Sequence, residues 1–296
     1  MNIKFNYEQD SIAQSARSIE LLIQQDPGAR GLGKWGTNGG LFPVAVSLAG
    51  GKHILVITGF YILDAGTIET DGPPGVIVLA DALCKAGKTV TILTDKYAED
   101  IMKAGMKSIG CEAELMVFAV DEKINPDSII RSTTTHCIAL ERPGLAADGL
   151  HHNFRGINIS DYVAPLDDVF LKCTSKGILT IGIGDGGNEL GMGNVSEAVD
   201  KYIAPHGALS CKIQSDYCIC AGVSNWAGYA LTGLIALLCG KNLMPDFASL
   251  TSIIDSIVKA GAVDGVTCKQ ETTVDNLPRT WEDGIYKQIY AIAFQQ

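Results

Sequence analysis

The chain has 296 residues, of which 47% are hydrophobic and 19% are charged, so it can bury a sizeable core and does not have the composition of a disordered protein. Its formal net charge of −10 argues against nucleic acid and anionic membranes as partners, because like charges repel. Nine cysteines without Cys-x-x-Cys spacing indicate reduced thiols. With no apolar signal segment near the first residue, we expect a cytoplasmic protein.

The first predicted element is an amphipathic helix at residues 12–25, which ends at Asp26-Pro27-Gly28. A loop with five glycines follows at residues 30–40, and a short helix at 42–49. The continuous apolar run at 53–59 is typical of a strand buried on both faces. Further strands are expected at 89–93, 115–120, 135–140, 177–184 and 217–221, and helices at 75–86, 97–109, 163–174, 195–203, 226–239, 247–259 and 281–294.

Alternation of strands and helices at this spacing predicts βαβ units. We therefore expect an α/β fold, with three α/β/α layers around a mainly parallel sheet, in a single domain at residues 1–296 that leaves room for a small second lobe. Parallel sheets bind ligands at the carboxyl ends of their strands. Loops at 58–75, 141–156 and 184–194 should all meet at that edge.

The glycine-rich run IGIGDGGNELGMGN at residues 181–194 is the most specific of these loops. Its Gly182-x-Gly184-x-x-Gly187 spacing matches a dinucleotide-binding fingerprint, but the charge of Asp185 would repel a pyrophosphate. The oxygens of Asp185 and Glu189 are instead ligands suited to Mg²⁺ or Mn²⁺. The simpler alternative is that Asp185 and Asn188 cap the next helix.

The same run resembles the metal-binding loop of haloacid-dehalogenase-type phosphatases. That family requires an Asp-x-Asp-x-Thr nucleophile after an early strand. The nearest segment here, Asp64-Ala65-Gly66-Thr67, lacks the second aspartate, so the sequence argues against this family.

Acidic residues also concentrate in the other predicted loops. Glu69 and Asp71 lie two residues apart, so an extended loop would point both the same way, where they need a cation or a shared proton. Glu141 ends a strand, and His151 in the same loop is either an acid–base group or a structural histidine. Arg155 could clamp a carboxylate with two hydrogen bonds. Near the C-terminus, Asp264, Glu271 and Asp275 add acids for which a surface role is an equal alternative.

Taken in order from residue 58 to residue 275, several runs resemble the D-glutamate cyclase C-terminal-like family. These runs are TGF, ETDGPPG, ERPG, NFRG, GIGDGGNELGMG, SNWAGYAL, DGVT and ETTVD. The resemblance implies an α/β fold and conversion of D-glutamate, or a close amino dicarboxylate, to 5-oxo-D-proline. Resemblance to stand-alone microbial members implies a divalent metal, with metal-dependent phosphoester hydrolysis as the alternative activity.

On this hypothesis the residues divide into three groups. The expected metal ligands for Mg²⁺ or Mn²⁺ are Glu69, Asp71, Asp185 and Glu189, and the expected catalytic residues are Asp185, Glu189, Glu271 and His151. The expected substrate-binding residues are Thr58, Asn153, Arg155, Gly186, Gly187 and Asn188. The expected partner is a small amino dicarboxylate, and assembly into a homo-oligomer is left open. A non-catalytic binding module is the third hypothesis, disfavoured by acids on four loops.

Overall fold

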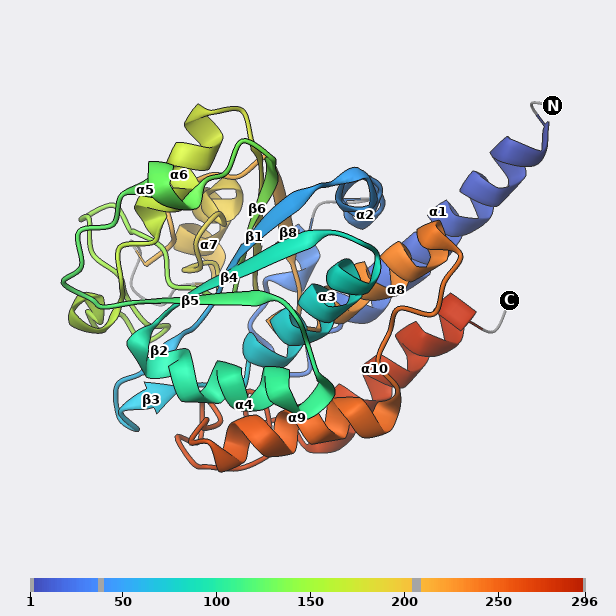
Figure 1. Ribbon diagram of the computed structural model, residues 1–296. Coiled ribbons are helices and arrows are strands. Elements are labelled where there is room, and N and C mark those ends of the chain that lie inside the picture. The colour runs from blue at the N-terminus through green and yellow to red at the C-terminus, as the bar shows by residue number, and fades with distance from the viewer. Residues whose placement is uncertain (1–2, 37–39, 204–208, 295–296) are drawn as a thin grey trace.

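The computed structural model describes residues 3–36, 40–203 and 209–294 and contains a six-stranded parallel sheet (Figure 1). Its strands in chain order are β1 (His53–Ile57), β4 (Thr89–Asp95), β5 (Glu114–Phe118), β6 (Thr134–Leu140), β7 (Leu179–Gly184) and β8 (Tyr217–Cys220). They lie side by side in the order β5-β4-β1-β6-β7-β8, and every neighbouring pair is parallel. The predicted α/β class with a parallel sheet is confirmed.

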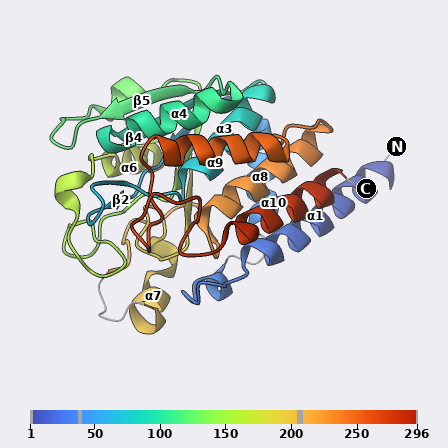
Figure 2. The same ribbon diagram turned by 90° about the horizontal axis from the view of Figure 1, so that it is seen from below.

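Helices cover both faces of the sheet, which gives the three expected layers (Figures 1 and 2). The larger layer holds α1 (Ile3–Ile23), α2 (Leu41–Gly50), α3 (Pro73–Lys85), α4 (Glu99–Ile109), α8 (Ser224–Cys239), α9 (Phe247–Lys259) and α10 (Arg279–Phe294). The opposite face is covered by α5 (Pro126–Ile129) and α6 (Asp167–Ser175). Helix α7 (Ser196–Tyr202) lies to one side, at the lower edge of the view in Figure 2.

Alternation along the strands assigns each side chain to one of two cores. In β1, Ile54 and Val56 pack into the larger helical layer, whereas Leu55 and Ile57 pack beneath α6. All five side chains of β1 are buried. A central strand buried on both faces has no polar side, which is why its sequence is a continuous apolar run.

The structure corrects several boundaries of the expected elements. The first helix begins at Ile3 instead of residue 12, and β4 continues to Asp95. The helix expected at 163–174 begins only at Asp167. Pro165 explains the late start, because a proline disfavours helical geometry in the residue before it.

A two-stranded antiparallel hairpin lies outside the main sheet. It consists of β2 (Tyr61–Ile62) and β3 (Thr67–Ile68), inside the segment expected to be a loop at 58–75. Four short 3-10 helices complete the described elements: Gly33–Trp35, Lys96–Ala98, Ser160–Tyr162 and Gly193–Val195. Within the described residues, no helix combines the length and the apolar character that a membrane span requires.

The strand order places a crevice at a defined point of the sheet. Connections from β1 run outward to β4 and β5, whereas β6, β7 and β8 continue in the opposite direction. Ligands in open α/β sheets bind where the order reverses, at the carboxyl ends of the strands. The reversal lies between β1 and β6, and loops after β1, β6 and β7 all begin at that edge.

Candidate active site

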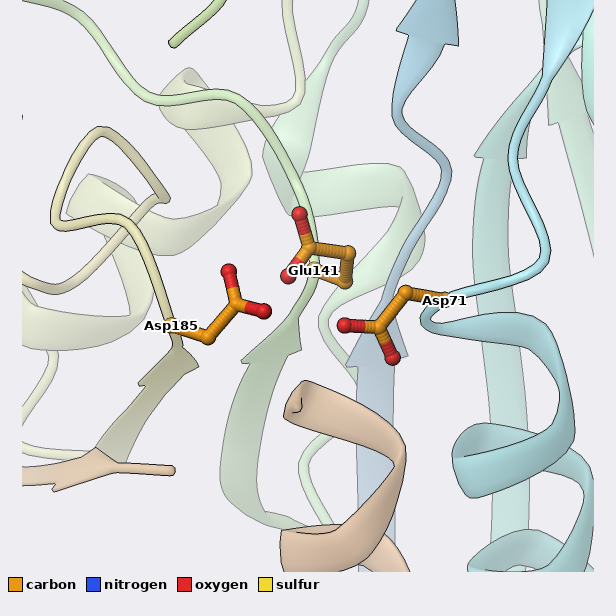
Figure 3. Close-up of side chains that lie close together, drawn as sticks. All are labelled: Asp71, Glu141 and Asp185. Carbon is orange, nitrogen blue, oxygen red and sulfur yellow. The ribbon is translucent and has the colours of Figure 1, made fainter. Parts of the chain in front are cut away.

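Three carboxylates meet at this edge, each from a different loop (Figure 3). Asp71 ends the loop between β1 and α3, Glu141 directly follows β6, and Asp185 directly follows β7. One oxygen from each side chain lies within 4.8 Å of the other two, and all three residues are buried. The predicted convergence of the Asp71 and Asp185 loops is confirmed, with Glu141 lying between them.

Asp71 is held by the start of helix α8. Its Oδ1 accepts a hydrogen bond from the backbone N–H of Asn225 at 2.8 Å, and its Oδ2 accepts one from the N–H of Ser224 at 2.8 Å. In return, Asn225 Oδ1 accepts hydrogen bonds from the N–H groups of Gly72 (3.0 Å) and Gly75 (2.8 Å) at the start of α3. Each residue therefore satisfies free N–H groups of the other's helix.

Glu141 adopts a backbone conformation that is rare for a residue with a side chain. Its φ is 45°, and its Oε2 accepts a hydrogen bond from Ser224 Oγ at 2.6 Å. Gly72 lies against it with φ 98°, and a Cβ at that position would come within 2.8 Å of the Glu141 Cβ. Strained conformations of this kind concentrate at functional sites because the surrounding structure has to maintain them.

The loop that carries Asp185 is closed by Glu189. Glu189 Oε1 accepts hydrogen bonds from the N–H groups of Asp185 (3.0 Å) and Gly186 (2.7 Å), and Oε2 accepts one from Gly187 N–H (2.6 Å). The Glu189 carboxylate thus shapes the loop, and the N–H groups of Gly186 and Gly187 are already used. Among the described residues, the group within metal-binding distance contains Asp185 but neither Glu189 nor Glu69.

Arg30 is the cation of the site. Its Nη1 donates to Asp185 Oδ1 at 2.5 Å, and its Nη2 donates to Asp275 Oδ1. The second oxygen of each carboxylate, Oδ2, is buried and has no hydrogen-bond partner. The guanidinium also lies over the ring of Phe154, 5.6 Å from its centroid. Arg30 therefore bridges two acids and leaves both of them half satisfied.

Burial raises the pKa of Asp71, Glu141 and Asp185 well above the usual carboxyl range, and neighbouring acids raise each pKa further. Arg30 opposes this effect at Asp185, and the N–H groups of Asn225 and Ser224 oppose it at Asp71. Burial and three aspartates, Asp275, Asp71 and Asp264, likewise raise the pKa of Glu69. Such a cluster is stable only with bound protons or with a cation.

A pocket of about 540 Å³ opens above the three acids. Its lining includes Arg30, Glu69, Glu141, Phe154, Glu189 and Asp275. Asp71 and Asp185 are not among the lining residues and lie below the floor, each with 1% of its surface exposed. This volume is within the range of small-molecule sites in proteins.

Of the predicted substrate-binding residues, Asn153, Arg155 and Asn188 line this pocket. Arg155 is at the rim, with 58% of its side chain exposed and an ion pair to Asp64 at 3.2 Å. Asn188 Nδ2 donates to the carbonyl of His152, and Asn153 Oδ1 accepts hydrogen bonds from the N–H groups of its own turn. Their contact with a substrate stays a prediction.

The pocket lining excludes five further predicted residues: Thr58, His151, Gly186, Gly187 and Glu271. His151 Nε2 is 2.9 Å from Asp167 Oδ2 in a buried pair, and Glu271 is exposed beside Lys269. Thr58 is buried at the end of β1, with its Oγ1 lacking a partner. A catalytic role for Glu271 or His151 gains no geometric support, because neither lines the pocket.

Sequence reasoning missed Arg30 as a site residue and did not include Glu141 among the metal ligands. Arg30 lies 155 residues from Asp185 in the sequence, in a loop that was predicted only from its five glycines. The one available signal for Glu141 was its position at a strand end, where it stands without another acid nearby in sequence. Asp275 was noted only as one of several C-terminal acids.

Comparison with known proteins identifies the family of the chain. The human protein named D-glutamate cyclase, mitochondrial, is 33% identical over 288 residues. That alignment covers 86% of this chain and 46% of the human protein, so the chain spans about half the length of its relative. Residues 19–289 match the family described as D-glutamate cyclase-like, C-terminal, and the chain belongs to this family.

Proposed function

We propose that this chain is a divalent-metal-dependent enzyme that cyclises D-glutamate to 5-oxo-D-proline. The observation that carries the proposal is the buried group of Asp71, Glu141 and Asp185 beneath a pocket of about 540 Å³. Family membership and the name of the human relative support the choice of reaction. Neither refers to phosphoester hydrolysis, and we do not propose that activity.

The reaction defines what the site has to supply. The amine nitrogen of D-glutamate forms a bond to the γ-carboxyl carbon, and one oxygen of that carboxylate leaves as water. The ammonium group starts with three protons, of which one stays on the lactam nitrogen and two leave with the water. The protein must therefore take a proton from the ammonium, return protons to the leaving oxygen, and neutralise a carboxylate that is otherwise a poor electrophile.

The residues present fit a hard divalent cation. Three carboxylates from three loops offer oxygens within 4.8 Å of one another, and Asp185 Oδ2 is a buried oxygen without a partner. Oxygen ligands of this kind suit Mg²⁺ or Mn²⁺. We propose Asp71, Glu141 and Asp185 as the holding residues, since Glu189 is occupied by its own loop. When bound, the cation would act as a Lewis acid toward the γ-carboxylate.

Glu69 is the best-placed group for the proton transfers. It lines the pocket, whereas Asp71 and Asp185 lie beneath the floor. Burial and neighbouring acids raise its pKa well above the usual value, which is the direction of shift that general acid–base catalysis by a carboxyl group requires. Gly265 packs against its carboxylate, so that a side chain at this position would collide with Glu69 Oε2. We therefore propose that Glu69 takes the ammonium proton and protonates the leaving oxygen.

Direct assay of the purified chain tests this proposal. D-Glutamate, L-glutamate and a phosphate ester are each incubated with Mn²⁺ or Mg²⁺, and loss of primary amine, formation of 5-oxoproline by NMR and release of phosphate are followed. The expected result is lactam formation from D-glutamate with the divalent cation present. Phosphate release without loss of amine would transfer the function to ester hydrolysis.

A pair of matched variants links the activity to the site. Glu141→Gln removes one charge from the cluster while preserving shape, and should lower kcat/KM by at least about a hundredfold. Glu114→Gln removes a carboxylate at the opposite edge of the sheet, beside Arg131, and should retain the activity of the unmodified chain. Equal activities in the two variants would contradict the assignment.

A further inference from the structure

The guanidinium of Arg30 is divided between two carboxylates that it does not fully satisfy. It makes one hydrogen bond to Asp185 and one to Asp275, and the Oδ2 atoms of both acids are buried without partners. Arginine binds a single carboxylate best through two parallel hydrogen bonds. The observed arrangement is that of a cation that neutralises a cluster, with neither acid bound in the two-bond geometry.

We propose that Arg30 acts as an internal counter-ion when no divalent cation is bound, and that cation binding releases its guanidinium to bind the α-carboxylate of the substrate. This inference rests on the proposed function and assigns the residue that recognises one end of a dicarboxylate. It also predicts an order of binding, in which the divalent cation binds first and the dicarboxylate substrate binds second.

The charges around Arg30 support this order. Glu69, Glu141, Asp185 and Asp275 all act on Arg30 electrostatically, and Asp71 acts on Asp185. One guanidinium cannot neutralise so many acids, and a dicarboxylate that entered this pocket would meet further negative charge. A divalent cation at Asp71, Glu141 and Asp185 would replace Arg30 as the partner of Asp185, and would then attract the substrate.

The position of Arg30 suits it to this role better than that of Arg155. Both residues line the pocket, but the Arg155 side chain is 58% exposed and paired with an exposed acid, whereas that of Arg30 is 19% exposed. The Arg30 backbone is fixed, because Asp26 accepts hydrogen bonds from the N–H groups of Arg30 and Gly31. Phe154 supports the guanidinium from one side. The side chain can therefore exchange partners without movement of the loop.

Calorimetric titration of the purified chain tests both parts of the proposal. Mn²⁺ alone is titrated into wild type, Arg30→Met and the control Arg131→Met, which removes a cation paired with Glu114 at the opposite edge of the sheet. Loss of the competing guanidinium should tighten Mn²⁺ binding in Arg30→Met by about tenfold or more, since only this substitution removes a cation that is hydrogen-bonded to the proposed ligand Asp185. Arg131→Met reports the effect of net charge alone.

Recognition of the α-carboxylate is then measured with ligands that cannot react. Glutarate keeps both carboxylates of the substrate but has no amine, and butyrate has a single carboxylate. With saturating Mn²⁺, wild type should bind glutarate about tenfold or more tightly than butyrate, and without Mn²⁺ it should bind neither. Arg30→Met should lose the preference for glutarate while keeping its affinity for butyrate.

A second variant, Arg30→Lys, separates the effect of the positive charge from the effect of the guanidinium geometry. It also replaces Arg30→Met in the test if that variant does not fold. Arg30→Lys keeps the charge but loses the planar fork, so its Mn²⁺ affinity should stay near wild type while the glutarate preference falls. Weaker or unchanged Mn²⁺ binding in Arg30→Met, or an intact glutarate preference in either variant, would overturn the proposal. Failure of the proposed cyclisation is a separate result, because neither titration depends on turnover.

Discussion

Asp71, just before α3, and Asn225, in the first turn of α8, each accept hydrogen bonds from N–H groups at the start of the other's helix. The carboxylate of Asp71 accepts hydrogen bonds from N–H groups of α8, and Asn225 Oδ1 accepts hydrogen bonds from N–H groups at the start of α3. Asn225 Nδ2 also donates a hydrogen bond to the carbonyl of Thr70 at 3.0 Å. The first turns of two long helices are thereby fixed to each other directly below the pocket. A carboxylate of the candidate metal site is thus also part of the helical framework.

Replacement of Asn225 by alanine should therefore destabilise the whole protein. The variant leaves the buried N–H of Gly75 and the carbonyl of Thr70 without partners, whereas the N–H of Gly72 keeps Asp71 Oδ1 as its acceptor. We expect a loss of about 2–4 kcal/mol in the free energy of unfolding. Urea denaturation measures it. The control Asn242→Ala removes an exposed amide that donates only to Tyr290, and should change stability by less than about 0.5 kcal/mol. Similar losses in both variants would contradict the capping role.

Asp185→Asn tests the metal site independently of turnover. The asparagine keeps the shape of the side chain and an oxygen for Arg30, but removes a charged ligand. A cation at 100 times its Kd should stabilise wild type by about 2.7 kcal/mol, visible as a rise in Tm, and this rise should be largely lost in Asp185→Asn. Asp127→Asn, at an exposed acid paired with Lys172 and Lys176, should respond like wild type. An unchanged rise in Asp185→Asn would remove Asp185 from the site.

Gly265→Ala should impair turnover more than folding. The added Cβ would occupy the position of Glu69 Oε2 and displace that carboxylate from the pocket. Loss of a proton-transfer group typically costs about a hundredfold or more in kcat. In Gly284→Ala the new Cβ has no neighbour within 4 Å, so this helical position should tolerate alanine with full activity. Full activity of Gly265→Ala would argue against Glu69 as the acid–base group.

The pH dependence of stability should reveal a further buried acid, Glu282, which lies outside the pocket lining. Burial raises its pKa from 4.5 to about 7, against the opposing effect of hydrogen bonds from Tyr229 OH and Trp226 Nε1. The folded protein therefore binds more protons than the unfolded chain between these values. The stabilising contribution is complete below pH 4.5 and is lost as the pH rises through 7, with a total of about 3 kcal/mol.

Glu282→Gln isolates this contribution, because glutamine does not titrate. Urea unfolding of both proteins from pH 5 to pH 8, with a chelator present, should show a steeper loss of stability in wild type than in the variant. The difference between the two curves reports Glu282 together with its electrostatic effect on Asp71, and it removes the effect of the other acids at the pocket. Curves of equal slope would show that Glu282 does not change its protonation over this range.

The layered fold could be predicted because its signals are local. The apolar run of β1, the alternation of strands with helices, and glycines at helix ends act over a few residues. The hairpin of β2 and β3 was missed because strands of two residues carry no detectable periodicity. The late start of α6 shows that Pro165 outweighed the apolar pattern before it.

The site was predictable only as far as strand order brings loops together. Asp71 and Asp185 could be placed at one edge because each follows a strand. Glu189 shows the limit of this reasoning, since an acid in a glycine-rich loop can fold back onto the N–H groups of that loop. The role of Arg30 could not be predicted, because its contact with Asp185 spans 155 residues and its local sequence does not indicate this partner.

Because Asp71, Glu141 and Asp185 come from three separate connections, the proposed cation site can form only after the central strands have assembled. A chain that has folded half of its sheet would present single carboxylates with little affinity for a divalent ion. Such an ion would therefore act after the rate-limiting step of folding, slowing escape from the native state while leaving the refolding rate unchanged. In a cell with scarce metal, the lifetime of the protein would follow the supply of its ion.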